Sequence, residues 1–425
     1  MRHVEGYKPF VTRRVFMVRT TKISEHSKQF NPLQPVVLDS LPERPLVSIL
    51  ISNYNYAEYL GDAIESSLRQ TYDNLEVVVC DDGSTDGSSG ILERFQSQDR
   101  RVKVIYQSNS GQALALNEAF LKSSGQIICL LDADDVFALG KLRCVVNSFH
   151  SAPDSGFAVN RMLRVDKMRK CSGVIPMLSG LPSGWRGPSL SLAAPQMLPG
   201  MPPCSGLSLR RQIAEAIFPL PQGLTAYADT LIQVLAPLIT PIVAMQAPLS
   251  EYRVHGGNTA AVNAFTEDRL RNLVVWEKEI WHAWRQYLTS RSELASQLLP
   301  SSDAPYLPMA YAHARFRSAP DSKAVYDAIP ASYFRALPRE RRWFWRASVL
   351  MPKRIFRKCF ALVYGQTRAK GVVSGILSSF RTDFRRRKQF FEQTERTRHK
   401  VQNANRNPGV DQIAGARAMR DELCN

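Results

Sequence analysis

Three carboxylates stand within four positions, at Asp132, Asp134 and Asp135, directly after an apolar run. Like charges this close repel one another unless water, a helix N-terminus or a cation relieves them. Carboxylate oxygens are the ligands that hard cations such as Mg²⁺ and Mn²⁺ prefer. We therefore expect a divalent-cation site here, with helix capping near Leu139 as the alternative.

Polar residues also follow two earlier apolar runs. Asn53, Tyr54 and Asn55 come after the first run, and Asp81 and Asp82 open the segment DDGSTDGS after the second. The chain has neither G-x-G-x-x-G after the first run nor G-K-[ST], which disfavours dinucleotide and P-loop sites. Acids at neighbouring strand ends would repel a bare diphosphate, but they suit one bridged by Mg²⁺ or Mn²⁺.

The elements that must position these residues are predicted by hydrophobic periodicity. Continuous β-rich runs predict strands buried on both faces at residues 46–52, 75–80, 102–106 and 126–131. Helical spacing predicts helices around Leu60, Ile91, Ala113 and Leu139. This alternation indicates an α/β fold with a mostly parallel sheet, in which ligands bind beyond the carboxyl ends of the strands.

Ordered blocks then carry a resemblance to a known family. They are VSILISNYNYAEYLGDAIESSLRQTYDNLEVVVCDDGSTD, NSGQALALNEAF, SSGQIICLLDADD with a following GKL, PCSGLSLRR, AYADTLIQVLAPL and APLSEYRVHGGN. Together they resemble the inverting glycosyltransferases of family 2 over residues 45 to about 258. The resemblance implies the GT-A fold of nucleotide-diphospho-sugar transferases.

The resemblance also implies roles for individual residues. Those assigned to the nucleotide sugar are Tyr54, Asp82, Asn109, Gly111, Asn117 and Asp132. Within this set, Asp82 would read the nucleobase edge, with Tyr54 beside the base. Asp134 would bind Mn²⁺ or Mg²⁺ on the donor diphosphate, and Asp132 would share the metal shell. His255 would approach the metal from the far side, and a role in loop packing stays open beside that one.

A sugar hydroxyl is a poor nucleophile, so transfer requires a carboxylate that takes its proton. Asp229 matches the aspartate of the family's Glu-Asp motif, whose role is that of the base, although Ala228 stands where glutamate is usual. The alternative for Asp229 is a helix N-cap. By contrast, the apolar stripe of Trp276, Ile280 and Trp284 predicts core packing.

Charge is distributed unevenly along the chain. The 425 residues carry a net charge of +17, of which +15 lies in residues 331–425. This basic part suits an anionic surface, and aromatic residues among the cations of residues 341–365 favour a lipid headgroup layer over a docked helix. No nucleic-acid partner is expected, because no recognised binding module accompanies the charge.

The sequence also predicts the cellular compartment and the domain boundaries. Seven cysteines without a C-x-x-C spacing predict free thiols in a reducing cytosol, and residues 1–20 lack an apolar signal segment. We expect a cytoplasmic protein, with peripheral attachment to the cytoplasmic face of the membrane left open. The predicted parts are an N-terminal extension (1–44), a GT-A catalytic domain (45–258) and a basic helical C-terminal region (259–425).

The expected function is metal-dependent, inverting transfer of one sugar from a nucleoside-diphosphate sugar to a saccharide or lipid-linked acceptor, in surface polysaccharide biosynthesis. Two other functions stay open at this point. One is a metal-dependent nucleotidyltransferase, and the other is a non-catalytic nucleotide-sugar-binding membrane adaptor.

Overall fold

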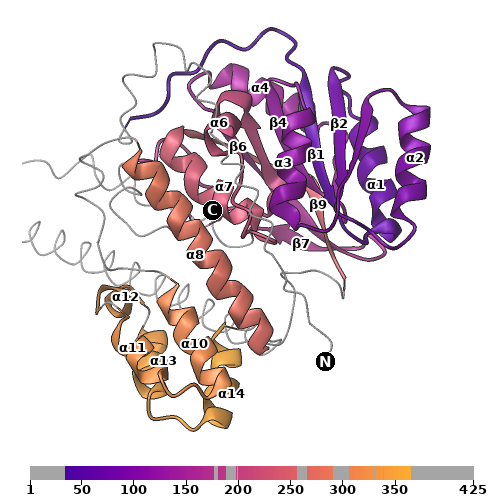
Figure 1. Cartoon of the computed structure of the whole chain (residues 1–425). Helices are drawn as coiled ribbons and strands as arrows, with labels where there is room; N and C mark the ends of the chain where they lie inside the picture. The colour runs from indigo at the N-terminus through magenta and orange to yellow at the C-terminus, as the bar shows by residue number, and fades with distance from the viewer. Residues whose placement is uncertain are drawn as a thin grey trace, which may run out of the picture. The chain divides into compact units, whose positions relative to one another are not determined.

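A computed structural model describes residues 34–176, 180–187, 198, 200–255, 266–290, 306–329, 331–337 and 339–364 (Figure 1). Residues 1–33 of the expected N-terminal extension and residues 365–425 of the expected basic region lie outside this set. The described strands are β1 (Val47–Asn53), β2 (Leu75–Asp81), β3 (Val102–Tyr106), β4 (Ile127–Asp132), β5 (Val136–Phe137), β6 (Phe157–Asp166), β7 (Cys171–Ile175), β8 (Leu207–Arg210) and β9 (Ile242–Val254).

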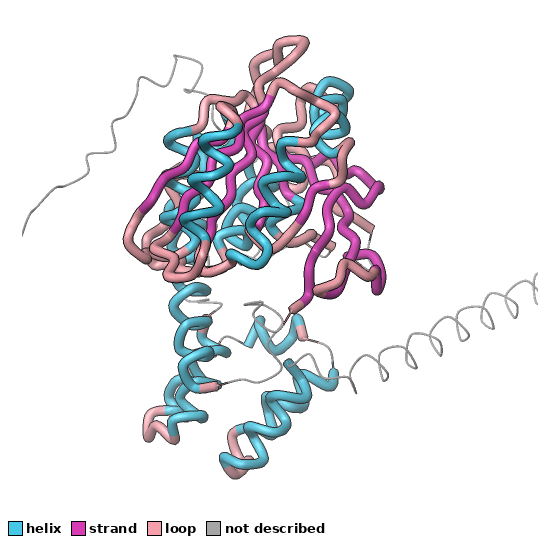
Figure 2. The backbone as a smooth tube through the Cα atoms, turned by 90° about the vertical axis from the view of Figure 1, so that its right-hand side faces the viewer, coloured by secondary structure: helices cyan, strands magenta, loops and turns pink. Residues whose placement is uncertain are grey.

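The helices that accompany the sheet cover both of its faces (Figures 1 and 2). They are α1 (Ala57–Leu68), α2 (Ser88–Gln98), α3 (Gln112–Lys122), α4 (Lys141–Ser151), the 3-10 helix η2 (Cys204–Gly206), α6 (Arg211–Ile217), α7 (Ala228–Ile239) and α8 (Glu267–Thr289). One core lies under α1, α2 and α4, and a second lies under α3, α6, α7 and α8. Trp276, Ile280 and Trp284 of α8 are buried in the second core, which confirms that the stripe is core packing.

The four expected strands agree with β1–β4 to within one residue at each end, and they pair in parallel in the order β3-β2-β1-β4. Ser52 of β1 lies opposite Asp132, and Asn53 opposite Asp81, so the carboxyl ends of three strands meet. Beyond β4 the sheet is mixed, because β8 runs antiparallel to both β4 and β6, while β6 and β9 are parallel.

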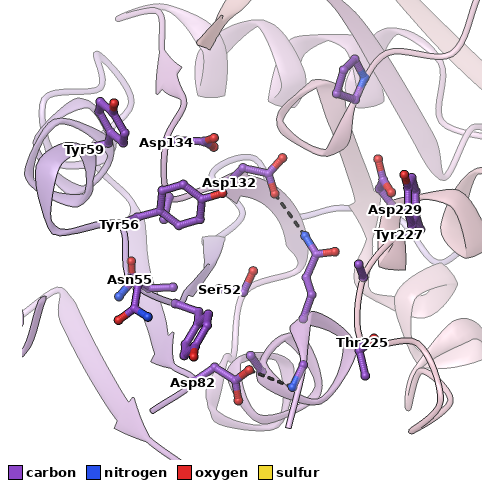
Figure 3. A pocket seen from close by; sticks show the side chains of 18 of the residues that line it. Ser52, Asn55, Tyr56, Tyr59, Asp82, Asp132, Asp134, Thr225, Tyr227 and Asp229 are labelled. Carbon is purple, nitrogen blue, oxygen red and sulfur yellow. Dashed lines mark hydrogen bonds between the residues drawn. The ribbon is translucent and has the colours of Figure 1, made fainter. Parts of the chain in front are cut away.

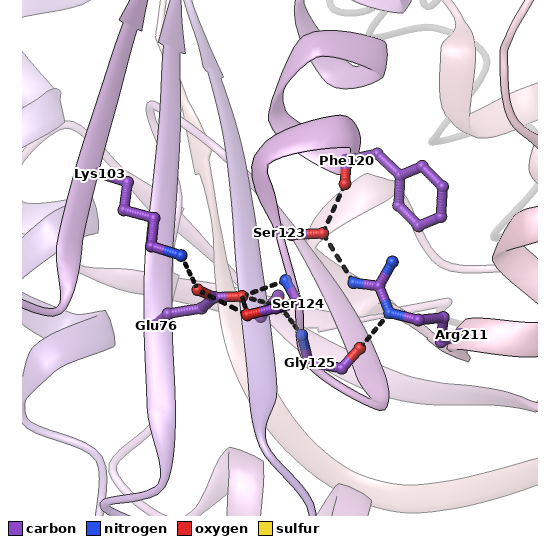
Figure 4. A network of polar contacts seen from close by, with 8 residues as sticks. Glu76, Lys103, Phe120, Ser123, Ser124, Gly125 and Arg211 are labelled. Atoms are coloured by element: carbon purple, nitrogen blue, oxygen red, sulfur yellow. Dashed lines mark hydrogen bonds and ion pairs between the residues drawn. The ribbon is translucent and has the colours of Figure 1, made fainter.

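A buried polar network at the opposite ends of these strands fixes where β4 begins (Figure 4). Glu76 of β2 accepts hydrogen bonds from Lys103 Nζ and from the Ser124 amide, both at 2.6 Å. Arg211 at the start of α6 donates from Nε to the Gly125 carbonyl at 2.5 Å. The link between α3 and β4 is therefore held by a side chain from β2 and by one from α6.

The C-terminal helices of the described chain are α10 (Leu307–Arg317), α11 (Ser322–Asp327), α12 (Ala331–Ala336), α13 (Arg339–Ser348) and α14 (Lys353–Tyr364). Backbone contacts divide the described residues into one compact unit that ends at Phe356 and another that begins at Arg357. None of the helices within the described ranges is both long and apolar enough to cross a bilayer.

Candidate active site

A cavity of about 1080 Å³ opens at the carboxyl ends of β1, β2 and β4 (Figure 3). It is lined by eight of the site residues expected from the sequence, namely Tyr54, Asp82, Asn109, Gly111, Asp132, Asp134, Asp229 and His255. Asn117 is not among the lining residues. Its buried amide donates to the Leu220 carbonyl at 2.9 Å and accepts from the Leu220 amide at 2.7 Å, so it ties α3 to the segment before α7.

The acidic turn after β4 brings three carboxylates together, since one oxygen of each of Asp132, Asp134 and Asp135 lies within 4.8 Å of the other two. Burial, and then repulsion from Asp134 and Asp229, raise the pKa of Asp132 to about 8. Burial also raises the pKa of Asp135 well above its usual range. The acids do not cap α4, since that helix begins after Gly140 and no described side chain caps it.

Asp135 is buried, and both of its carboxylate oxygens are held by the protein. Its Oδ2 accepts a hydrogen bond of 2.6 Å from Ser205 Oγ, and its Oδ1 accepts one of 2.9 Å from the Arg253 amide. The Ser205 hydroxyl also accepts from the Asp132 amide at 3.0 Å. The turn is therefore clamped by η2 and β9, and Asp132 and Asp134 are left to line the cavity.

A buried lysine holds Ser205, the residue that contacts Asp135, in place. Lys141, fully buried at the start of α4, donates from Nζ to the Ser205 carbonyl at 2.6 Å, to Ser250 Oγ at 3.0 Å and to Asn160 Oδ1 at 3.1 Å. Burial lowers the pKa of Lys141 to about 8. Three hydrogen-bond acceptors compensate the buried ammonium, and its position fixes the carbonyl of the residue that holds Asp135.

His255 closes the other side of the acidic turn. Its Nε2 lies 2.9 Å from Asp134 Oδ2, and its ring packs on Tyr59 with the ring centroids 4.7 Å apart. Tyr56 meets the same imidazole edge-on at 5.8 Å. Burial and the nearby carboxylates raise the pKa of Tyr56, so its phenol stays protonated beside the acids. The ring packing agrees with the loop-packing interpretation of His255, and a role of His255 at a metal stays a prediction.

Asp82 and Gly111 shape the opposite wall. The Asp82 carboxylate accepts from the Ser110 amide at 2.7 Å and from the Gly111 amide at 2.8 Å. Gly111 has φ of +93°, and a Cβ there would lie 2.5 Å from the Thr225 Cα. Only glycine fits this position without strain, because both the backbone angle and the space exclude a side chain. The segment around Thr225 is thereby brought against the N-terminus of α3.

Asp229 enters the cavity from the first turn of α7. In the view of Figure 3, Asp132 lies between Tyr56 and Asp229. Burial raises the pKa of Asp229. The N-cap of α7 is Tyr227, in a left-handed conformation with φ of +61°, so Asp229 is not the N-cap. Ala228 is fully buried in the core, so the position where the family usually has glutamate does not face the cavity.

Several residues of this site were missed by sequence reasoning. Tyr56, Tyr59 and Ser205 contact the acidic turn or His255, and Gln112 donates to Asp132 Oδ1 at 3.3 Å. Each of them lies inside a block that carries the resemblance, so the block marked the region without indicating the contact. Met201, Pro202 and Pro203 also line the cavity, whereas most of residues 177–199 lie outside the described set.

The donor set fits a hard divalent cation. Asp132 and Asp134 offer carboxylate oxygens on the cavity side, and His255 offers an imidazole nitrogen. Burial, and then repulsion from Asp134 and Asp229, raise the pKa of Asp132, and a cation between the carboxylates would offset that repulsion. Both oxygens of Asp135 already accept hydrogen bonds from the protein, so it is not needed as a ligand.

Comparison with known proteins agrees with this geometry. A family model described as glycosyl transferase family 2 matches residues 48–218. A glycosyltransferase of Nostoc sp., alr2836, is 36% identical over 236 residues, which cover 53% of this chain and 70% of that protein. TuaG of Bacillus subtilis is 38% identical over 100 residues, 23% of this chain and 40% of TuaG, and its name assigns it provisionally to teichuronic acid biosynthesis.

Among solved structures, TarS 1–349 of S. aureus in complex with UDP-GlcNAc is 16% identical, with a TM-score of 0.49 over 73% of this chain and 89% of that one. The decisive similarity is that to the Nostoc protein, because it extends over more than two thirds of that protein's length at 36% identity. Together with the matched family model and the cavity at the strand ends, it shows that the chain is a glycosyltransferase and belongs to family 2.

Proposed function

We propose that this glycosyltransferase moves one sugar, with inversion, from a nucleoside-diphosphate donor to a hydroxyl of a saccharide or lipid-linked saccharide. The observation that carries the proposal is the placement of Asp229, with its raised pKa, in the same cavity as Asp132 and Asp134. A base and a diphosphate-side acidic pair are the two groups that a single displacement needs.

The proposed step balances as a direct substitution at the anomeric carbon. The acceptor oxygen forms the new bond to that carbon, while the bond from the carbon to the diphosphate oxygen breaks and its electron pair leaves with the nucleoside diphosphate. Asp229 takes the hydroxyl proton. A raised pKa suits this task, because a base works best when its pKa lies near the working pH.

On the donor side, Asp132, Asp134 and His255 would hold Mn²⁺ or Mg²⁺, which would supply positive charge to the departing diphosphate. Tyr54, Asp82, Asn109 and Gly111 line the wall that would receive the nucleoside. The setting that we propose is the assembly of a surface polysaccharide. The name of TuaG, which refers to teichuronic acid biosynthesis, motivates this setting, because the acceptor would then be a saccharide.

The test separates donor binding from transfer. Asp134→Ala should remove most of the affinity for UDP or GDP in Mn²⁺, and EDTA should do the same to the natural chain. Asp229→Asn should bind the nucleotide normally but lower donor turnover by a factor of about 100 or more, the scale of a lost general base. The control is Asp154→Asn, an exposed acid outside the cavity, which should change neither quantity.

Two results would contradict the proposal. Equal nucleotide affinity with Mn²⁺ and with EDTA would exclude the cation bridge. An Asp229→Asn protein that keeps half its turnover on a panel of nucleotide sugars would assign the base to another carboxylate.

A further inference from the structure

The part of the chain that includes α13 and α14 is strongly basic. Residues 341–364 contain seven Lys or Arg residues and no Asp or Glu. No acid within this stretch offsets the positive charge, so its exposed cations suit an anionic surface. The cations alone do not distinguish a solvated surface from a binding surface, and the apolar residues between them decide this.

Most of the aromatic residues in this stretch face inward. Trp345 and Phe356 are fully buried, and both pack on Tyr311 of α10, with ring centroids 5.8 and 6.0 Å apart. Phe344 stacks on Phe356 at 5.8 Å. The expectation that the aromatic residues as a group face lipid is therefore not met by these three, which form a small core of their own.

The large apolar side chains of residues 341–364 that remain exposed are Trp343 on α13, Leu362 on α14, and Leu350 and Ile355 where α13 is joined to α14. Leu350 is 88% exposed and Ile355 is 50% exposed, and the residues between them include the exposed cations Lys353 and Arg354. The connection is nevertheless anchored at its base, because Arg315 of α10 donates a hydrogen bond to the Met351 carbonyl. The connection and the first turn of α14 thus carry two exposed aliphatic side chains, one on either side in the sequence of two adjacent positive charges.

We propose that residues 350–355, the connection after α13 together with the first turn of α14 and called the loop below, dock on an anionic lipid surface. A lipid surface would contact both kinds of side chain. Lys353 and Arg354 would bind headgroup phosphates, and Leu350 and Ile355 would insert at the boundary between headgroups and acyl chains. Nucleic-acid phosphates would use the cations but would leave the aliphatic side chains in water. A single exposed leucine is common on solvated surfaces, so it is the pairing of two exposed aliphatic side chains with two neighbouring cations that favours lipid.

The test uses the full chain and sedimentation with vesicles of phosphatidylcholine, alone or with one quarter phosphatidylglycerol. The natural protein should pellet with the anionic vesicles, less so in high salt. The double variant Lys353→Gln/Arg354→Gln should lower the partition coefficient by a factor of about 25, which is about fivefold per charge. Leu350→Ser should lower it by about fivefold or more.

Matched control variants on the catalytic domain distinguish a specific effect of the loop from a general effect of positive charge or of exposed apolar side chains. Met168 is 88% exposed, as Leu350 is, so Met168→Ser should leave the partition unchanged. Arg100→Gln/Lys122→Gln removes two exposed charges elsewhere and should change the partition by less than about twofold.

Three outcomes would overturn the proposal. Equal sedimentation of the loop variants and the natural protein with anionic vesicles would contradict the proposal. Vesicle binding that survives the loop variants but disappears when the chain ends at Tyr364 would assign it to the residues beyond. Binding of single-stranded RNA that depends on Lys353 and Arg354 but not on Leu350, without vesicle binding, would make the loop a nucleic-acid surface.

Discussion

At the scale of the residue, the acidic turn depends on a serine that is neither a candidate ligand nor a candidate base. The Ser205 hydroxyl contacts Asp135 Oδ2 and the Asp132 amide, and its carbonyl accepts from Lys141 and Ser250. The side chain thus sets the spacing of the carboxylates from behind. We expect Ser205 to be a positioning residue whose loss loosens the proposed cation site.

Ser205→Ala should raise the dissociation constant for Mn²⁺ about tenfold or more, the scale of a lost outer-shell contact to a metal ligand. Calorimetric titration with Mn²⁺ alone measures this without turnover. Ser208→Ala is the matched control, since Ser208 is equally buried and its hydroxyl has no hydrogen-bond partner among the described residues. Equal Mn²⁺ affinity in both variants would show that the serine contributes to folding alone.

At the scale of the element, predictability follows the physical origin of each signal. Strands β1, β2 and β4 are buried on both faces, so their apolar runs are continuous and their bounds could be predicted from the sequence. Strands β6 and β9 are only partly buried and contain bulges, so no clean run marks them. Most residues of the candidate site lie at the carboxyl ends of β1, β2 and β4, so they could be predicted from the strands. Ser205 and Lys141 are brought to the site by tertiary packing, which the sequence pattern does not indicate.

Helix α13 offers a test of which aromatic residues support the fold. Trp345 is fully buried and Trp343 is 70% exposed, two positions apart on the same helix. Trp345→Ala should lower the free energy of unfolding by about 3–5 kcal/mol. Trp343→Ala should stay within about 0.5 kcal/mol of the natural chain. Urea unfolding followed by circular dichroism measures both, and equal losses would contradict the described packing.

At the scale of the whole molecule, acid stability should depend on the network around Glu76. Burial works to raise the pKa of Glu76, but the hydrogen bonds from Lys103, Ser48 and Ser124 outweigh it and leave the pKa lowered. A carboxyl with a lowered folded pKa stabilises the protein above its unfolded pKa. That contribution is lost as the pH falls through the folded pKa, below about 4.5.

Glu76→Gln should therefore cost about 2 kcal/mol of unfolding free energy at pH 7, the scale of charged hydrogen bonds lost from a buried group. The difference from the natural chain should shrink as the pH falls below 4.5, the ordinary value for glutamate. The control is Glu65→Gln, whose carboxylate pairs with Arg69 on the surface of α1 and is 56% exposed. A gap that stays constant with pH would exclude the proposed linkage.

The clamp on Asp135 also bears on the order of events during synthesis. Its two partners, Ser205 and Arg253, are translated 70 and 118 residues later. At about 5–20 residues per second, the strands β1–β4 are available roughly ten seconds before the second partner emerges from the ribosome. A nascent chain therefore carries the three acids before the hydrogen-bond partners of Asp135 have been synthesised. Closing loops of this length is a late and slow event, so a product of premature termination before Arg253 retains the nucleotide-side strands without a finished acidic turn.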